Sequence, residues 1–266
     1  MFFLPLGKLF QKQNMKNYIF PIVAICCCYL FFSCQQDKST TTKTETKTSP
    51  VTPETKKAAG EWTVLFDGVS GGHWRKYGTT HFPDKGWMVD QGALVLLPKS
   101  GGGDIITKEK YQNFDLQLEF KAAKGANSGI FYLVQEIEGQ PAYKSAPEYQ
   151  IIDDDNYIKI SEGDPSVTKH HLTADNYDLQ TAANKKLNPA GQWNSARIVL
   201  NKGHVEHYLN GAKVVEYDLW SSDWEAMVKG SKFADWEEYA KADKGHIGLQ
   251  DHGDMVAFRN IRIKKL

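Results

Sequence analysis

The chain has 266 residues, of which 41% are apolar and 12% aromatic, with 32 basic and 32 acidic side chains. It is too long for a small disulfide-stapled domain and too rich in aromatic residues for a disordered protein. The formal charge of zero conceals an uneven distribution, because residues 61–266 carry 24 basic and 29 acidic side chains. An acidic domain argues against a nucleic-acid-binding surface, which is normally basic.

The first 34 residues have the features of an export signal. An almost uninterrupted apolar stretch of fifteen residues, Tyr18–Phe32, follows Lys16 and ends at Ser33-Cys34. It is shorter than the roughly 20 residues of a membrane-spanning helix and fits the core of a signal peptide. The small residue before the cysteine resembles a bacterial lipobox, which predicts cleavage before Cys34 and a lipid on Cys34. The alternative is an uncleaved anchor. Both predict an exported protein that is tethered to a membrane of the cell envelope.

Residues 35–60 are predicted to form a flexible stalk. They contain eight Thr, two Pro and no aromatic residue, so they cannot bury enough apolar surface to offset the entropy of ordering. All four cysteines lie before residue 35 (Cys26, Cys27, Cys28 and Cys34). The predicted domain, residues 61–266, therefore has no disulfide, thiolate metal site or cysteine nucleophile.

From Glu61 onward the apolar residues mostly alternate with polar ones, as in strands with one face in water. The clearest case is residues 114–121, and Asn210-Gly211 is a strong hairpin signal. Residues 128–134 are apolar on both faces, which predicts a strand covered on both sides. Further strands are expected at 62–66, 87–89, 93–97, 147–153, 196–200, 204–209, 213–219, 246–250 and 255–263.

The region 221–244 departs from the strand pattern. Ser222 and Glu225 resemble a capping box, and Trp224, Met227 and Val228 follow at helical spacing. The sequence thus predicts an all-β fold, a single sandwich of two antiparallel sheets with a short helical insert packed on it.

The best candidate for chemistry is the segment 147–153. In a strand, Glu148 and Gln150 point to one face, and a bulge at Ile151-Ile152 would return Asp153 to that face. Two carboxylates and an amide would then line one groove, which suits acid–base catalysis because neighbouring carboxylates can differ in pKa. The spacing also resembles the Glu-x-Asp-x-x-Glu strand of laminarinase-type retaining glucanases. The alternative is a solvated strand face that ends in an acidic turn.

Other candidates are weaker individually. Asn127 begins the doubly covered strand, and His252 lies in a polar loop after a strand, where it is a candidate catalytic residue. The neighbouring Asp251 and Asp254 can hold a divalent cation through oxygen ligands, so a cation is possible, whereas no histidine pair has the spacing of a zinc site. Trp87 and Trp220 are our candidates for a platform on which a sugar ring stacks.

Several short motifs occur in the same order as in a known family. They are Leu65-Phe66-Asp67-Gly68, Trp87-Met88-Val89-Asp90, Asn113-Phe114-Asp115, Asn127-Ser128-Gly129-Ile130, Glu148-Tyr149-Gln150, Trp193-Asn194, Asn210-Gly211, Gly248-Leu249-Gln250 and Phe258-Arg259-Asn260-Ile261. Residues 61–266 thereby resemble the 3-keto-disaccharide hydrolase domain family of Bacteroidota and related bacteria. The resemblance implies a concanavalin A-like lectin/glucanase jelly roll and cleavage of glycosides that carry a ketone on carbon 3. It also implies groove positions at Asn127, Glu148, Gln150 and Asp153, with Gln250, His252 and Arg259 nearby.

The sequence is compatible with three functions. The first is cleavage of 3-keto-glycosides, in which Glu148 or His252 removes the proton next to the ketone. The second is ordinary retaining hydrolysis with Glu148 as nucleophile and Asp153 as acid–base, which needs carboxyl groups about 5–5.5 Å apart. The third is a non-catalytic surface lectin that binds glycans. An enzyme requires a pocket with a carboxyl group of raised pKa, whereas a lectin requires a shallow platform.

Overall fold

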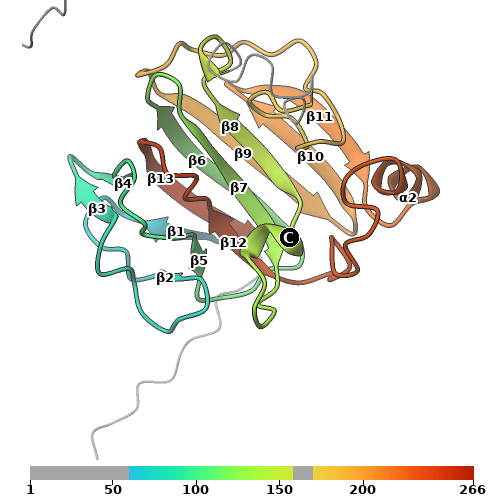
Figure 1. The fold of residues 1–266 in the computed structure, drawn as a ribbon, viewed down its shortest axis with the longest axis horizontal. Helices are drawn as coiled ribbons and strands as arrows, with labels where there is room; N and C mark the ends of the chain where they lie inside the picture. Colours follow the sequence, from blue (N-terminus) through green and yellow to red (C-terminus); the bar gives the residue numbers. More distant parts are fainter. Residues whose placement is uncertain (1–59, 158–169) are drawn as a thin grey trace, which may run out of the picture. The chain divides into compact units, whose positions relative to one another are not determined.

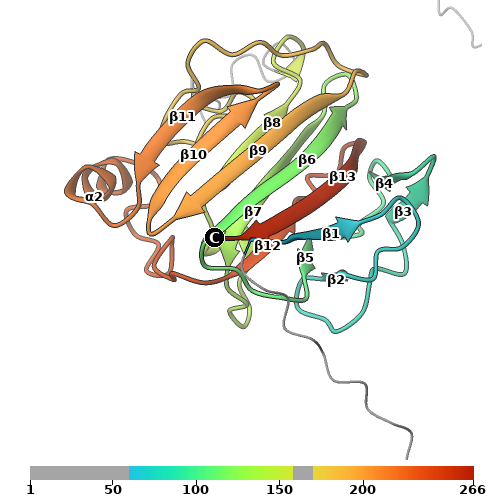
Figure 2. The same ribbon diagram turned by 180° about the vertical axis from the view of Figure 1, so that it is seen from behind.

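The computed structural model describes residues 60–157 and 170–266, and these fold into two antiparallel sheets (Figure 1; Figure 2 shows the reverse side). The larger sheet has eight strands in the order β11 (Ala212–Asp218), β10 (His204–Leu209), β9 (Asn194–Asn201), β6 (Phe114–Ala122), β13 (Val256–Lys265), β4 (Ala93–Leu96) and β3 (Trp87–Asp90), with β1 (Trp62–Phe66) also paired to β13. The smaller sheet has the order β2 (Trp74–Lys76), β5 (Ile105–Thr107), β12 (His246–Leu249), β7 (Asn127–Val134) and β8 (Glu148–Ile152).

The core lies between the two sheets and is built from the inward residues of each strand. In β6, the apolar residues Phe114, Leu116, Leu118 and Phe120 are all buried, whereas the intervening Gln117 and Glu119 are only partly covered. The period of two in the sequence therefore marks the inner face correctly, because successive side chains of a strand point to opposite sides. The predicted jelly-roll sandwich of two antiparallel sheets is confirmed.

All of the expected strands are present, and two further strands of the smaller sheet were not predicted. β2 and β5 have three residues each, so they are too short to show a period. The hairpin between β10 and β11 turns at Asn210 and Gly211, whose φ angles are +48° and +85°. Two consecutive positive φ angles are the requirement that makes Asn-Gly favourable at such a turn.

The helical insert begins with α2 (Ser222–Lys229), beside the ends of β10 and β11 (Figure 1). Its N-cap is Ser221, whose hydroxyl accepts a hydrogen bond from the Trp224 backbone N–H at 3.2 Å. The predicted capping box started at Ser222, so the helix begins one residue earlier than that prediction placed it. Beyond α2 the insert continues in turns. Trp224 is buried and stacks on Tyr217 of β11 with ring centroids 5.2 Å apart, which attaches the insert to the larger sheet.

Every residue of β7 is buried, as predicted for a strand covered on both sides. Ile130 and Tyr132 belong to the core between the sheets, whereas Phe131 packs with Val134 and Ala146 in a second, smaller apolar cluster. The short 3-10 helix η1 (Ala142–Lys144) contributes Ala142 to that cluster. Other segments of the protein therefore pack on the outer face of β7 and shield it from water.

The predicted signal, Cys34 and the stalk up to residue 59 lie outside the described residues. Within residues 60–157 and 170–266, no helix is both long enough and apolar enough to cross a membrane.

Candidate active site

A cavity of about 300 Å³ lies where the outer face of β7 and β8 meets the insert and the loop after β12. This volume is at the lower end of the range for small-molecule sites. Its lining combines a carboxyl group, amides, an imidazole, an ammonium group and several aromatic rings. The lining residues are Asn127, Tyr143, Ala146, Glu148, Gln150, Tyr177, Lys232, Phe233, Trp236, Tyr239, Gln250 and His252.

The pairing of β8 with β7 positions Glu148 in this cavity. Tyr149 and Ile151 point into the core, so Glu148 and Gln150 face the cavity because side chains alternate along a strand. The Glu148 carboxyl lies directly over Gly129 of β7. A Cβ atom on Gly129 would be 1.9 Å from Oε1 of Glu148, so the glycine provides the space that the carboxyl group occupies.

The environment of Glu148 favours the protonated form of its carboxyl group. Its side chain is only 6% exposed, and burial raises its pKa well above the usual value. The positive charge of Lys232 opposes this rise, and the charge of Asp104 adds to it. Oε1 has no hydrogen-bond partner among the described residues. A buried oxygen without a partner, next to a cavity, is in place to bind a proton of a ligand.

Amide groups lie on the same face as Glu148. Gln150 donates from Nε2 to Oδ1 of Asn127 at 2.9 Å, which fixes both side chains. Gln250 is held through its backbone N–H, which donates to the Gly129 carbonyl at 3.0 Å. Its side-chain Oε1, like that of Glu148, has no partner among the residues described. The structure thus brings Glu148 and Gln150 of β8 together with Asn127 and Gln250, which lie in other parts of the sequence.

The loop with His252 is anchored by two aspartates. Asp251 accepts hydrogen bonds from the backbone N–H groups of Gly103 and Gly253 at 2.7 and 2.9 Å, and Asp254 accepts one from the backbone of Asn127 at 3.0 Å. These carboxylates, considered above as cation ligands, hold the loop to its neighbours. His252 itself is exposed and lines the cavity.

Aromatic residues form one wall of the cavity, and the sequence reasoning did not assign them to the site. Trp236 lies 5.8 Å from Tyr143 and 4.9 Å from Phe233 between ring centroids, and Phe233 stacks on Tyr239 at 4.0 Å. Such a wall offers flat apolar faces on which a sugar ring can pack. The sequence does contain a signal for this wall, because Phe233, Trp236 and Tyr239 recur at intervals of three residues.

The prediction that Asp153 shares the face of Glu148 is wrong. The β7–β8 register runs without a shift from Phe131 opposite Glu148 to Asn127 opposite Ile152, so there is no bulge. Asp153 instead accepts hydrogen bonds at 2.7 Å from the Gly125 backbone and from the Asn156 amide, and it lines a different hollow.

The two tryptophans proposed as a sugar platform also lie elsewhere. Trp87 is 5% exposed and belongs to the core, and its Nε1 donates to the Gly103 carbonyl at 2.8 Å. Trp220 is exposed, but its Nε1 donates to the Ala240 carbonyl at 2.7 Å and its ring covers Gly203. Neither residue lines the cavity.

Arg259 is likewise remote from the cavity. It lies on β13 of the larger sheet, where it pairs with Glu119 at 2.7 Å and its guanidinium lies 4.0 Å from the ring centroid of Trp193. These contacts place it on the outer face of that sheet, because the inward residues of β13 are the buried ones, such as Phe258 and Ile261.

A wider trough of about 900 Å³ crosses the outer face of the larger sheet. Its arginines already have partners: Arg197 forms an ion pair with Asp115 at 2.9 Å, and Arg262 donates to Gln117 at 2.7 Å. The arginines of the trough are thus already bound by other side chains of the protein, whereas the cavity at Glu148 contains a polar atom without a partner in the described part of the chain.

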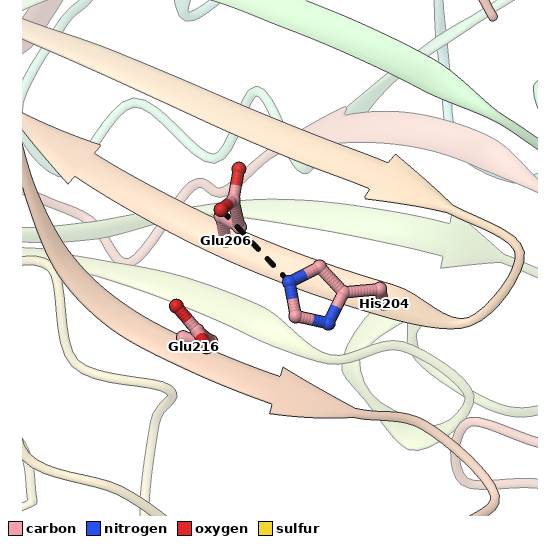
Figure 3. Close-up of side chains that lie close together, drawn as sticks. All are labelled: His204, Glu206 and Glu216. Atoms are coloured by element: carbon pink, nitrogen blue, oxygen red, sulfur yellow. Dashed lines mark ion pairs between the residues drawn. The ribbon is translucent and has the colours of Figure 1, made fainter.

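The same outer face carries the group of three potential metal ligands found among the described residues, namely His204, Glu206 and Glu216 (Figure 3). The ammonium of Lys213 forms ion pairs with both glutamates, at 3.1 Å from Glu206. This cation already offsets part of the negative charge of the two carboxylates. The group belongs to β10 and β11, whereas the cavity lies on the smaller sheet.

Comparison with known proteins shows the family to which the chain is similar. A family model described as the 3-keto-alpha-glucoside-1,2-lyase-like domain matches residues 61–264. A protein of Bacteroides thetaiotaomicron named 3-keto-disaccharide hydrolase is 37% identical over 235 residues, which cover 78% of this chain and 79% of the relative.

Two solved structures of Parabacteroides distasonis proteins, both described as glycosyl hydrolases, are similar as well. One is 35% identical with a TM-score of 0.71 and covers 77% of this chain and 94% of its own. The other is 28% identical with a TM-score of 0.57 and covers 77% and 100%.

Proposed function

The chain belongs to the family of 3-keto-alpha-glucoside-1,2-lyase-like domains, and on this basis we propose that it cleaves the glycosidic bond of 3-keto-glycosides by removing the proton next to the ketone. Its similarity to a named 3-keto-disaccharide hydrolase and to glycosyl hydrolase structures identifies it as a glycosidase-like hydrolase. The mechanism, the roles of the residues and the substrate are our proposal.

The proposed reaction begins with Glu148. A ketone on carbon 3 makes the proton on carbon 2 acidic, and the Glu148 carboxylate takes that proton. The electrons of the C2–H bond form an enolate whose negative charge lies largely on the ketone oxygen. A base with a raised pKa is suited to this step because it has a higher affinity for the proton that it must accept.

The enolate then expels the group on carbon 1. The ketone re-forms, a double bond forms between carbons 1 and 2, and the leaving oxygen takes a proton, for which exposed His252 is the proposed donor. Addition of water across this double bond returns a proton to carbon 2, adds hydroxyl to carbon 1 and completes the hydrolysis. Gln250 and the Asn127–Gln150 pair offer hydrogen bonds that orient the sugar.

The observation that carries the proposal is the buried Glu148 carboxyl group, with an unpartnered oxygen and a raised pKa, beside a cavity. A retaining glycosidase needs a second carboxylate beside the first, and Asp153, the candidate for that role, lines another hollow. A lectin needs an open platform with exposed tryptophan, whereas this site is an indented cavity with a perturbed acid. Both alternatives fit the geometry less well.

A matched pair of substrates tests the proposal. The domain is incubated with 4-nitrophenyl α-glucoside and with its 3-keto derivative, and release of nitrophenol is compared with a protein-free blank. We expect release above the blank from the keto form alone, because only the ketone acidifies carbon 2. Release from both forms would favour the retaining mechanism, and binding without release would favour the lectin.

We also propose that the protein is exported and is attached to the cell envelope by a lipid on Cys34, from the apolar stretch that ends at Ser33-Cys34. In cells fed a labelled fatty acid, the full-length chain should incorporate label, and Cys34→Ala should not. Cys28→Ala is the matched control, since it removes a cysteine within the signal. Equal labelling of wild type and Cys34→Ala would refute this attachment site.

A further inference from the structure

Lys232 is the ammonium group of the cavity, and neither the motifs nor the mechanism above assigns it a role. It follows α2 in the insert and lines the cavity together with Glu148, which comes from β8 of the smaller sheet. Its Nζ donates to the Tyr177 hydroxyl at 2.8 Å and lies 4.0 Å from the centroid of the Tyr177 ring. Lys232 and Tyr177 thus form a contact pair within the cavity wall.

The contacts of Lys232 leave part of its hydrogen-bonding capacity unused. An ammonium group has three N–H donors, and within residues 60–157 and 170–266 the Tyr177 hydroxyl is its hydrogen-bond acceptor. None of the ion pairs among these residues involves Lys232. Lys232 is exposed to solvent but also lines the cavity, so its remaining N–H donors are available to an oxygen of a bound ligand.

We propose that Lys232 and Tyr177 form the site that binds the ketone oxygen of the substrate and stabilises the negative charge which develops there. This inference rests on the proposed function and deepens it, because it names the residues that stabilise the ketone oxygen during proton removal. Glu148 would approach carbon 2 from the sheet, and Lys232 of the insert, together with Tyr177 from the chain between β8 and β9, would hold the oxygen on carbon 3.

The two groups have complementary properties for this role. When Glu148 takes the proton from carbon 2, one unit of negative charge moves to the ketone oxygen, where the ammonium of Lys232 and the Tyr177 hydroxyl donate hydrogen bonds. Burial raises the pKa of Tyr177, so its hydroxyl keeps the proton that it donates. Partial burial lowers the pKa of Lys232, against the charges of Asp178 and Glu148, which makes its ammonium a stronger hydrogen-bond donor.

Lys232 also acts on the proposed base, because its positive charge favours the ionised form of the Glu148 carboxyl group. The charge of Lys232 lowers the pKa of Glu148 against the effects of burial and of the charge of Asp104. Loss of Lys232 is therefore expected to have two consequences, a weaker stabilisation of the enolate and a higher pKa of the base. The second consequence distinguishes an electrostatic role from a packing role.

The test uses a ketone that can form the enolate but cannot be cleaved. The 3-ketone of 1,5-anhydroglucitol has no exocyclic leaving group on carbon 1, so exchange of its carbon-2 proton with deuterium in D₂O, followed by NMR, reports the first step alone. We expect Lys232→Met to slow this exchange, and kcat on the cleavable 3-keto-glucoside, by about 10²-fold, with a smaller change in KM. The acidic limb of the pH profile, where the base becomes protonated, should move to higher pH.

Three further variants complete the design. Lys232→Arg keeps the positive charge and should recover part of the rate, and Tyr177→Phe should slow exchange less than Lys232→Met does. Lys241→Met changes an exposed lysine of the same insert that does not line the cavity, so it should exchange at the wild-type rate. Melting temperatures identify any variant that fails to fold, and in that case Lys232→Arg and Tyr177→Phe decide the question.

The outcomes separate this inference from the proposed function. Wild-type exchange and cleavage by Lys232→Met, with an unmoved pH profile, would overturn the role of Lys232 and leave the proposed function intact. If wild-type protein exchanges the carbon-2 proton, Lys232→Met exchanges it more slowly, and neither cleaves the keto-glycoside, the oxygen-binding pair stands and the hydrolase proposal fails. If wild-type protein does neither, both fail.

Discussion

Glu148→Gln is expected to lower turnover of 3-keto-glycosides by about 10²–10⁴-fold, the usual contribution of a general base. The substitution keeps the size of the side chain and the place of its two polar atoms over Gly129, but an amide cannot accept the carbon-2 proton. The measurement is kcat on the keto substrate, with Glu138→Gln as a control, because Glu138 is an exposed carboxylate outside the cavity.

The same variant has an expected effect on stability that shows whether the domain remains folded. Because burial raises the pKa of Glu148 in the folded state, its contribution to stability is greatest below the unfolded-state pKa of about 4.3 and is lost as pH rises toward the folded-state pKa. The amide of the variant does not ionise. The variant should therefore unfold at the same or a higher temperature than wild type near pH 7, and the difference should shrink toward pH 4.

Wild-type turnover in Glu148→Gln would remove Glu148 from the mechanism and would make His252 the remaining candidate base. A large loss of turnover together with a lower melting temperature at neutral pH would instead indicate that the amide disturbs the fold. Only the combination of low turnover and retained stability supports the assignment of Glu148 as the base.

Local features of the sequence predicted the parts of the site that depend on the strand itself. Alternation alone places Glu148 and Gln150 on one side of β8 and Tyr149 and Ile151 on the other, and the structure agrees. The turn at Asn210-Gly211 is similarly local, because it depends on the φ angles that these two residues accept. Such features need no knowledge of the neighbouring strands.

The errors concern residues whose position is set by distant parts of the chain. Whether Asp153 returns to the face of Glu148 depends on the pairing of β8 with β7, and the regular register excludes the bulge. Trp87 and Trp236 have the same apolar character in the sequence, yet one fills the core and the other lines the cavity. The position of Trp236 at the cavity depends on how the insert packs against the sheets, which the sequence alone does not show.

Lys232 illustrates the same limit for a charged residue. In the sequence it is one of 20 lysines after residue 60, and nothing in its neighbours indicates a role in chemistry. Its importance arises from two interactions across long stretches of chain, a hydrogen bond to Tyr177 and the effect of its charge on Glu148. Groups brought together in this way are found only when the fold is known.

Gly129→Ala is expected to lower kcat/KM by about 10²-fold or more while the domain stays folded. The three atoms nearest to the added Cβ all belong to the Glu148 side chain, at 1.9 Å from Oε1, 2.7 Å from Cδ and 2.9 Å from Cγ. Because the end of a flexible side chain can move into the cavity, the carboxyl should shift instead of the sheet. A displacement of about 1 Å from the productive geometry is enough for a loss of this size.

A double-mutant cycle shows whether the loss acts through Glu148. In a Glu148→Ala background the carboxyl is absent, so Gly129→Ala should have no further effect on the residual rate, and the two changes should be strongly non-additive. Gly248→Ala is the matched control on the neighbouring β12, where a Cβ would meet Phe131 at 3.2 Å and not the carboxyl. If Gly129→Ala reduced the rate equally in both backgrounds, the glycine would act through the sheet. The proposed positioning of the base by the floor of the cavity would then be wrong, even if Glu148 itself proved essential.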